Sequence, residues 1–319
     1  MKMKHFLSTV AVAALMTASA HAQQATFTAN TPLGVTANGK YTAMSSNVKV
    51  YGGLVFSESC SYDPDRNLVV AVNRGAAQNV AVNDGFVSLI NHDGSVHTPA
   101  WIGATRAGLV LNDPLGSDIA NGKLYVADKD GGTADGAAPV NVVRIFDMKT
   151  GAPAGEIKIE GSVGFNDVAV AKDGTIYGTQ TGSATVVQRV YKITPDGKAS
   201  VLVEGAPLAR PNGIALDTEG NVAVVNLDSA AVLTFSPTGK LLKTEQASLP
   251  GNDGLVILAD GTKYVSSVMN GGMSRIRGGK AELIASGIPS PASICYDSQA
   301  KQIVIPMNPN NALGFLKVE

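Results

Sequence analysis

The sequence predicts an all-β protein, a six-bladed β-propeller with four antiparallel strands in each blade. Six related segments follow one another along the chain, each with a short alternating strand, a turn containing Gly or an acidic residue, and a second apolar strand. Successive segments start roughly 40 to 60 residues apart, which is the period of propeller blades. No stretch has a convincing helical period of apolar residues.

The clearest of these segments spans residues 211–226 and has the pattern of a β-hairpin. Residues 166–177 and 253–264 keep the same spacing of apolar, acidic and Gly positions. A second hairpin with Gly in its turn follows most copies, as in residues 190–199 and 232–241. Two hairpins in each repeat supply the four strands of a propeller blade. Three weaker copies begin near Glu58, near Ser117 and near Ala292.

The amino terminus has the pattern of a secretory signal. Basic residues open the chain, and residues 6–18 form an apolar run that is short for a membrane span. Small residues at Ala20 and Ala22 suit cleavage before Gln23, so residues 1–22 are predicted to be a signal peptide. An uncleaved membrane anchor is the alternative. Because no later apolar segment is long enough to cross a membrane, we expect a mature protein that is periplasmic or secreted.

The segment that follows the signal has little periodicity. Residues 23–47 are rich in Thr, Asn, Ala and Ser, and are predicted to be a flexible leader. The propeller is then expected to occupy residues 48–319. Residues 48–51 alternate like a strand and precede the first repeat, so we expect them to complete the last blade beside the carboxyl-terminal strands. Such closure leaves the ring without a long exposed gap.

Composition excludes one class of partner. The 25 Lys and Arg residues balance 26 Asp and Glu residues, and aromatic residues make up 5% of the chain. Neither a basic groove nor a stacking platform is apparent, so nucleic acid is not expected to bind. Single all-β domains can reach this length, and the repeat covers most of the chain, which predicts one propeller domain.

The two cysteines, Cys60 and Cys295, fall in the first and sixth repeats, which adjoin when a propeller ring closes. An oxidising compartment favours a disulfide between them. Their places in the repeat differ by one residue, however, which can direct the two side chains to opposite faces of their strands. A disulfide and two buried thiols therefore stand as equal alternatives. Two separated cysteines are too few for a zinc site.

The polar residue that begins each inner strand is the candidate for function, because these positions from six blades converge on the central channel. Five of the six carry oxygen donors, and none is Lys or Arg. Carboxylate and amide oxygens suit one divalent cation, with Ca²⁺ favoured and Zn²⁺, Mg²⁺ or Mn²⁺ as alternatives. The competing explanation is that loops entering strands need turn residues. The six positions are Glu58, Asp118, Asn166, Asn212, Asp253 and Ala292.

Four motifs occur in a characteristic order: residues 58–62 (Glu-Ser-Cys-Ser-Tyr), 165–167 (Phe-Asn-Asp), 211–214 (Pro-Asn-Gly-Ile), and 253–254 (Asp-Gly) followed by 270–272 (Asn-Gly-Gly). In these motifs the chain resembles the senescence marker protein (regucalcin)/gluconolactonase family of six-bladed propellers, over almost the whole mature sequence. The resemblance implies that Glu58, Asn212 and Asp253 bind one divalent cation and that Asn166 lies beside it. It also implies that Asp253 is the general base in lactone hydrolysis.

The chain departs from that family at specific positions. Gly164 stands where the sugar-lactone hydrolases have an Arg, and residues 58–62 lack the family's Pro and Trp. A preference for sugar lactones is therefore not implied. His92 and His97 belong to the outer hairpin of the first blade and are expected to be exposed turn residues. Residues 128–136 faintly resemble a calcium loop, but without the acidic twelfth residue of an EF-hand they are expected to form a polar surface turn.

The function expected from these features is a periplasmic, metal-dependent hydrolase of a lactone or related ester, acting on a small-molecule substrate. The cation would polarise the carbonyl, and Asp253 would activate water. One alternative is a non-catalytic propeller that binds a protein or small molecule, as NHL-repeat proteins do. Another is a lyase or a strictosidine-synthase-like enzyme. A serine nucleophile is not supported, because the chain lacks the Gly-x-Ser-x-Gly elbow.

Overall fold

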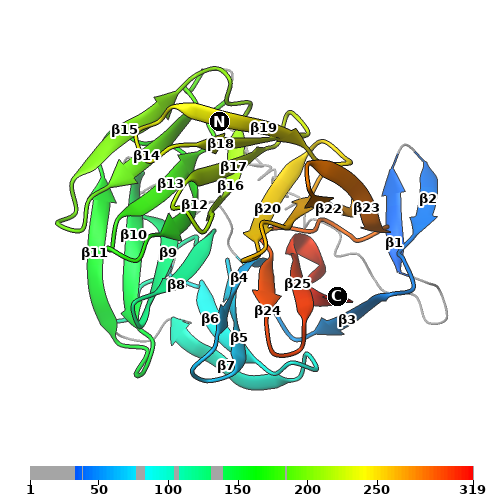
Figure 1. Cartoon of the computed structure of the whole chain (residues 1–319). Helices are drawn as coiled ribbons and strands as arrows, with labels where there is room; N and C mark the ends of the chain where they lie inside the picture. The colour runs from blue at the N-terminus through cyan, green and yellow to red at the C-terminus, as the bar shows by residue number, and fades with distance from the viewer. Residues whose placement is uncertain are drawn as a thin grey trace, which may run out of the picture.

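The computed structural model confirms the six-bladed propeller, with six four-stranded antiparallel sheets around a central channel (Figure 1). The residues predicted to be a signal peptide lie outside the described part of the chain. Within that part, the 3₁₀ turn η1 (Asn308–Asn310) is the one helical element, and no helix is long and apolar enough to cross a membrane. The structure describes residues 33–37, 39–76, 83–103, 108–130, 139–183 and 185–318.

In the first five blades the strands follow one another outward from the channel in chain order. Blade 1 holds β4 (Ser57–Asp63), β5 (Leu68–Asn73), β6 (Phe86–Ile90) and β7 (Val96–Gly103). Blade 2 holds β8 (Ser117–Ala120), β9 (Lys123–Asp130), β10 (Val140–Asp147) and β11 (Pro153–Ile159). Blade 3 holds β12 (Phe165–Val170), β13 (Ile176–Gln180), β14 (Arg189–Ile193) and β15 (Ala199–Glu204). Blade 4 holds β16 (Pro211–Leu216), β17 (Val222–Asn226), β18 (Ala231–Phe235) and β19 (Leu241–Gln246). Blade 5 holds β20 (Asn252–Ile257), β21 (Lys263–Ser267), β22 (Gly272–Arg277) and β23 (Lys280–Ser286).

The sixth blade is built from both ends of the propeller. Its strands β24 (Cys295–Asp297), β25 (Gln302–Met307) and β26 (Ala312–Lys317) come from the carboxyl-terminal part of the chain. The fourth strand is β3 (Val48–Gly52), which pairs antiparallel with β26. The prediction that residues 48–51 complete the last blade is therefore confirmed. The pairing closes the ring with backbone hydrogen bonds.

Burial differs between the strands of a blade in the way that blade packing requires. The second strands β5 and β17 are buried along their whole length, because both of their faces pack against neighbouring blades. The outer strand β19 is mostly exposed, because it lies at the rim. The apolar side chains form six clusters that together run around the ring. The core thus holds the inner strands, and the residues that they carry, in fixed positions around the channel.

Part of the segment expected to be a flexible leader has regular structure. Strands β1 (Gly34–Ala37) and β2 (Lys40–Ala43) pair as a hairpin. The chain that follows joins the propeller, because the amide of Ser45 donates a hydrogen bond to the carbonyl of Ser286. The sequence analysis missed this hairpin because its two strands are only four residues long and carry little alternation.

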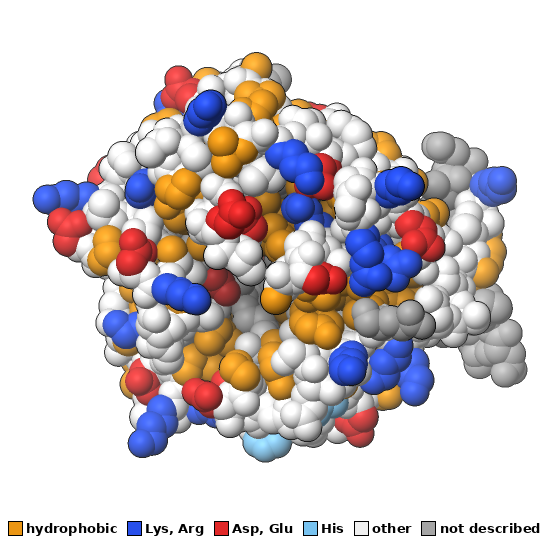
Figure 2. Space-filling view, viewed as in Figure 1, with side chains coloured by type: hydrophobic (Ala, Val, Ile, Leu, Met, Phe, Trp, Pro, Cys, Tyr) orange, Lys and Arg blue, Asp and Glu red, His pale blue; other side chains and the backbone are white. Residues whose placement is uncertain are grey.

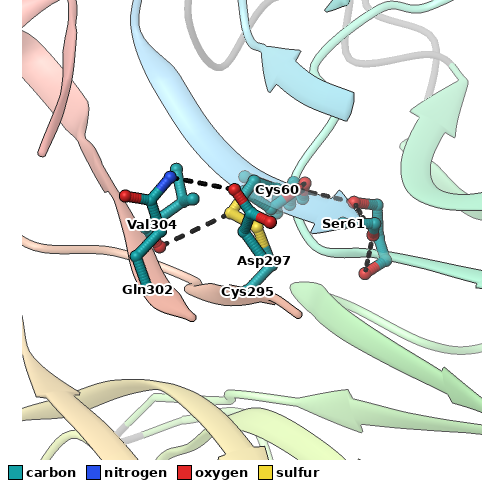
Figure 3. The surroundings of a disulfide bond; sticks show 9 residues. Cys60, Ser61, Cys295, Asp297, Gln302 and Val304 are labelled. Atoms are coloured by element: carbon teal, nitrogen blue, oxygen red, sulfur yellow. Dashed lines mark hydrogen bonds between the residues drawn. A yellow bond between two sulfur atoms is a disulfide. The ribbon is translucent and has the colours of Figure 1, made fainter. Parts of the chain in front are cut away.

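The two cysteines form a disulfide, which decides between the two alternatives left open by the sequence (Figure 3). Cys60 on β4 and Cys295 on β24 have Cα atoms 5.4 Å apart, so the bond joins the inner strands of the first and last blades. Direct backbone pairing between Ser59 and Ser293 holds the two strands together. In blade 6 the chain between this point and Cys295 departs from regular strand geometry. Counting residues from the start of the repeat therefore does not determine which way the side chain points.

Candidate functional site

The inner strands of neighbouring blades are linked in a repeating way at the start of each strand. The amide of Gly116 donates to the carbonyl of Asn166, and the amide of Ser293 donates to the carbonyl of Glu58. At two other junctions a hydroxyl group makes the link, since Thr179 donates to the carbonyl of Asn212 and Ser266 donates to that of Ala292. The hydroxyl of Ser59 likewise donates to the carbonyl of Leu115, and Gly213 closely approaches the carbonyl of Asp253. These contacts mark one equivalent position in each blade, which we call the ring positions. They are Glu58, Leu115, Asn166, Asn212, Asp253 and Ala292.

A β-bulge lies at the ring position of four blades. In β12, β16 and β20 three residues on the inner strand span the same length as two on its partner. In β4 the extra residue is Glu58. Bulges bend a strand and redirect the side chain that they carry, and they are common beside functional sites. The bulges therefore explain why the acid and amide side chains at the ring positions point away from the regular strand direction.

Three ring residues share an unusual feature. Glu58, Asn212 and Asp253 are almost fully buried, yet each has one oxygen with no hydrogen-bond partner: Oε2, Oδ1 and Oδ1, respectively. The amide Nδ2 of Asn212 donates to Oδ2 of Asp253 at 3.2 Å, which commits the nitrogen and leaves the amide oxygen available. Buried polar atoms almost always have partners. These oxygens are hard donors of the kind that Ca²⁺ prefers, so the residues present fit a divalent cation.

The electrostatics of the site agree with that fit. Burial raises the pKa of Glu58 to about 7, although the nearby Arg74 opposes the rise. Burial also raises the pKa of Asp253 well above its ordinary value, and the negative charges of Glu58 and Asp167 raise it further. Buried carboxylates that repel one another are relieved by a cation between them. Among the described residues, no three His, Cys, Asp or Glu side chains cluster as a metal site; the candidate set depends on the amide oxygen of Asn212.

The structure does not bring Asp118 together with these three residues. Leu115 occupies the ring position of blade 2, and Asp118 lies three residues farther along the chain. Its carboxylate accepts hydrogen bonds from the amides of Ile119 and Val170, so it connects blade 2 to blade 3. The sequence contained a signal for the correct alignment, because residues 114–116 (Pro-Leu-Gly) repeat the pattern of residues 211–213 (Pro-Asn-Gly).

Asn166 faces a cavity that adjoins the site. The cavity measures about 370 Å³, and both Asn166 and Glu58 line it. Gly164 also lines it, and a Cβ added there would have open space around it. Gly164, where the sugar-lactone hydrolases have an Arg, thus leaves open space in the cavity at its blade 3 wall.

Asn308 is a site residue that sequence reasoning missed. It lies in η1, between β25 and β26, and its side chain forms a hydrogen bond that lowers the pKa of Glu58. Its Oδ1 is buried and has no partner among the described residues. Blade 6 therefore supplies a polar group from this turn, whereas its ring residue is Ala292. No repeat signal marks Asn308, because it reaches the site from the connection between the second and third strands of its blade.

A network of ion pairs borders the same cavity. Arg74 and Lys129 both contact the carboxylate of Asp113, at 2.7 Å in each case. Burial alone would raise the pKa of Asp113, but hydrogen bonds and charges from these two cations hold it below its ordinary value. Behind them Asp128 pairs with Arg144 at 2.8 Å. The expectation of a polar surface turn is wrong for residues 128–130, which belong to β9; residues 131–138 lie outside the described part.

The two histidines of the outer hairpin differ from each other. His97 is exposed, as expected. His92 is only partly exposed, and its Nδ1 lies 2.5 Å from the fully buried carboxylate of Asp297. His92 is thus a turn residue, as expected, but it is only partly exposed. It joins the outer hairpin of blade 1 to the inner strand of blade 6, away from the ring positions.

A larger cavity of about 640 Å³ occupies the part of the channel that lies beyond the ring positions. Aliphatic residues near the ends of inner strands line it, among them Val170, Leu216 and Ile257. Figure 2 shows a face of the molecule that is hollowed near its centre, with many hydrophobic side chains around the hollow. Asp167 also lines this cavity; burial raises its pKa to about 8, and its oxygens accept the amides of Val168 and Ile214.

Comparison with known proteins places the chain in a family. The profile of the SMP-30/gluconolactonase/LRE-like region matches residues 20–305. The chain belongs to the SMP-30/gluconolactonase/LRE-like family. No curated protein sequence matches it significantly. The resemblance inferred from the four motifs is thereby confirmed.

Solved structures with the same fold share little sequence with this family member. A gluconolactonase from Xanthomonas campestris is 18% identical, with a TM-score of 0.60 over 86% of this chain and 91% of that one. A calcium-binding regucalcin from Agrobacterium tumefaciens is 16% identical, with a TM-score of 0.57 over 83% and 90%. Virginiamycin B lyase from Staphylococcus aureus is 13% identical, with a TM-score of 0.58 over 85% and 100%. These likenesses establish the propeller fold alone.

Proposed function

We propose that this protein is a divalent-metal-dependent hydrolase of a lactone or related ester. The observation that carries the proposal is the set of buried, unpartnered oxygens on Glu58, Asn212 and Asp253. Three such atoms at equivalent positions of different blades are costly to the fold unless a ligand completes them. Membership of the SMP-30/gluconolactonase/LRE-like family supports hydrolysis of a lactone as the reaction.

Glu58, Asn212 and Asp253 would hold one cation, with Asn166 at the edge of the site. Ca²⁺ best matches an all-oxygen set that includes an amide, and Zn²⁺, Mg²⁺ and Mn²⁺ are the alternatives. The cation would supply Lewis acidity, which polarises the substrate carbonyl and stabilises the negative charge that develops on its oxygen.

The chain's own residues position the other reactants. Asp253 is suited to accept the proton of the attacking water, because burial raises its pKa above the ordinary value of a carboxyl group and so makes its carboxylate more basic. Asn212 holds the Asp253 carboxylate through its Nδ2 and so fixes the direction of the basic oxygen. Asn166 lines the cavity beside Glu58, where its amide can bind the substrate.

The non-catalytic alternative makes a different demand on the ring. A non-catalytic propeller has no need for unpartnered oxygens on three blades. The unpartnered oxygens of Glu58, Asn212 and Asp253 therefore favour the hydrolase over a non-catalytic propeller.

We further propose that the protein acts after export, in the periplasm or outside the cell. The signal-like residues 1–22 motivate this proposal. The disulfide between Cys60 and Cys295 supports it, because structural disulfides persist in oxidising compartments.

The test is to measure the metal content of the purified protein and its hydrolysis of a lactone panel before and after chelation. We expect one bound divalent ion per chain, and turnover that is lost on chelation and restored by the cation. Asp253→Asn should lower kcat at least about 100-fold. The matched control is Asp196→Asn, since Asp196 lies in an exposed turn of blade 3. Turnover that survives both chelation and Asp253→Asn would rule out the proposed mechanism.

A further inference from the structure

The ring residue Glu58 takes its backbone position from the neighbouring blade. The ladder between β4 and β5 pairs Ser57 and Ser59 but passes over Glu58, which is the extra residue of the bulge. The carbonyl of Glu58 instead accepts the amide of Ser293 in blade 6 at 3.1 Å. Its side chain also has a hydrogen bond to Asn308 of blade 6. The position of Glu58 therefore depends on the contact between blades 1 and 6.

Two links to blade 6 flank Glu58 along the chain. On one side the amide of Phe56 donates a hydrogen bond to Oδ1 of Asn311 at 2.7 Å, in the connection between β25 and β26. On the other side Cys60, two residues after Glu58, forms the disulfide with Cys295 of β24 (Figure 3). The disulfide is therefore the covalent bond among the contacts that hold this part of β4 against blade 6.

Blade 6 has little regular pairing at the level of Glu58. Its inner strand β24 begins only at Cys295, whereas β16 and β20 already include the ring residues of their blades. An isolated bridge between Ser59 and Ser293 holds β4, with two backbone hydrogen bonds of 3.1 and 3.2 Å. A strand with a short ladder to its own sheet is less well fixed than one with a long ladder. The disulfide supplies the missing constraint at this point.

The disulfide also borders a route for small thiols. Cys60 and Cys295 are buried, and both line the larger cavity of about 640 Å³ in the channel. A dithiol that enters this cavity can attack one sulfur atom as a thiolate and displace the other. The S–S bond breaks, each cysteine becomes a thiol, and the dithiol is oxidised to a disulfide. Two electrons and two protons thereby pass to the protein.

We propose that the disulfide holds Glu58 in its cation-binding position, so that reduction of the bond weakens cation binding. Cys60 and Cys295 are then positioning residues that act through Glu58. This inference rests on the cation site of the proposed function. Coupling between two equilibria is reciprocal, so a cation that binds the oxidised protein more tightly also favours the oxidised protein by the same factor. Cation binding and the redox state of the ring closure are therefore linked.

The first experiment is calorimetry with Ca²⁺ alone. It compares the oxidised native protein, the reduced native protein and the Cys60→Ser/Cys295→Ser variant, which needs no reductant. We expect the Ca²⁺ affinity of the last two to be about tenfold lower, because Glu58 is less well held. Val190→Ala controls for a general loss of stability, since it removes buried methyl groups from β14 in blade 3. Its affinity should equal that of the oxidised native protein.

The second experiment measures reduction of the bond in dithiothreitol redox buffers, with labelling of the free thiols. Saturating Ca²⁺ should raise the ratio of reduced to oxidised dithiothreitol at half-reduction about tenfold, a shift of about 30 mV for this two-electron exchange. A disulfide that stabilises the fold without positioning Glu58 would show no such dependence on Ca²⁺.

Equal Ca²⁺ affinity in the oxidised and reduced proteins would overturn the inference and leave the proposed function intact. If the oxidised protein binds no Ca²⁺, the proposed function fails for this ion, and hydrogen exchange at the Ser293 amide tests the positioning by itself. Faster exchange in the reduced protein, with no change in Val190→Ala, supports the inference. Equal exchange in the oxidised and reduced proteins overturns it.

Asn311→Gly decides the question if the reduced proteins unfold, because it removes the link from Phe56 and keeps the disulfide. Ca²⁺ affinity close to that of the native protein supports the disulfide as the bond that positions Glu58. A loss of about tenfold would overturn the inference, since the Phe56 link would then hold Glu58.

Discussion

Buried carboxylate oxygens without hydrogen-bond partners are costly in any folded chain, and two of them, on Glu58 and Asp253, lie at ring positions. The charge of Glu58 raises the pKa of Asp253, and each of the two residues leaves one oxygen unpartnered. Asn212 is arranged so that its nitrogen serves Asp253 and its oxygen stays available. Removing water from such groups is unfavourable unless a cation replaces it. Under the proposed function, these residues would bind a cation at some expense of stability.

Asn308 provides a residue-scale test of the site. The Asn308→Ala change removes the side chain that hydrogen-bonds Glu58 from the direction of blade 6. We expect cation affinity, measured by calorimetry on the metal-free protein, to fall about tenfold because Glu58 is less well held. Asn310→Ala, in the same turn, is the matched control. Unchanged affinity in Asn308→Ala would remove Asn308 from the site.

Asp118 gives a second test at this scale, through the pH dependence of stability. Burial raises its pKa to about 6. A raised pKa in the folded state means that the stability contributed by this group is complete below about pH 4 and is lost as the pH rises through 6. Relative to Asp118→Asn, the native protein should therefore lose about 1 to 2 kcal/mol between pH 4 and pH 7.

The measurement is urea unfolding of both proteins in chelator across this pH range. The variant serves as the reference for all other groups that titrate. A difference in unfolding free energy that stays constant with pH would show that Asp118 ionises normally in the folded state.

At the scale of elements, the inner strands do two things: they build the channel wall, and they aim the ring side chains. The bulges in β4, β12, β16 and β20 orient the ring side chains. Close contact between neighbouring inner strands holds the channel wall rigid. At Gly213 a Cβ would overlap the carbonyl oxygen of Asp253, so β16 and β20 can approach this closely only because position 213 has no side chain.

Gly213→Ala tests this coupling between two blades. The backbone of β20 would have to move, so we expect a loss of about 2 kcal/mol or more in unfolding free energy. Cation affinity should fall as well, since Asn212 and Asp253 would separate. Gly52→Ala is a suitable control, because a Cβ at Gly52 meets no atom within 4 Å. A variant with native stability and affinity would show that the strands are not packed tightly at this point.

At the scale of the whole molecule, ring closure combines two devices. Strand β3 completes blade 6 through the ladder with β26, and the disulfide joins β4 to β24 near the channel. The disulfide closes a loop with a sequence separation of 235 residues. Cross-links across long loops restrict the unfolded chain most strongly.

The Cys60→Ser/Cys295→Ser double variant should consequently be less stable by about 2 to 5 kcal/mol in urea unfolding. A reductant should shift the native protein toward the value of the variant and leave the variant unchanged. If reductant has no effect on the native protein under conditions that break the bond, closure by β3 alone suffices for stability.

The sequence by itself determined the blade repeat, the closing strand, and the ring residues Glu58, Asn166, Asn212 and Asp253. These features are local: a hairpin period, a turn, and a polar residue at a constant phase can be read from adjacent residues. Asp118 was aligned with the ring residues in the sequence because the true ring residue of that blade, Leu115, is apolar and does not stand out as the polar residues of the other blades do.

Only the tertiary structure decided the rest of the site. Asn308 reaches Glu58 from a turn in the last blade, and Arg74 meets Lys129 through Asp113 across two blades. The disulfide likewise depends on how two distant strands approach each other. Closing the ring sets these distances, through packing between blades that no local pattern describes. The residue types at single positions could therefore be read from the sequence, whereas the spatial neighbours of each position required the fold.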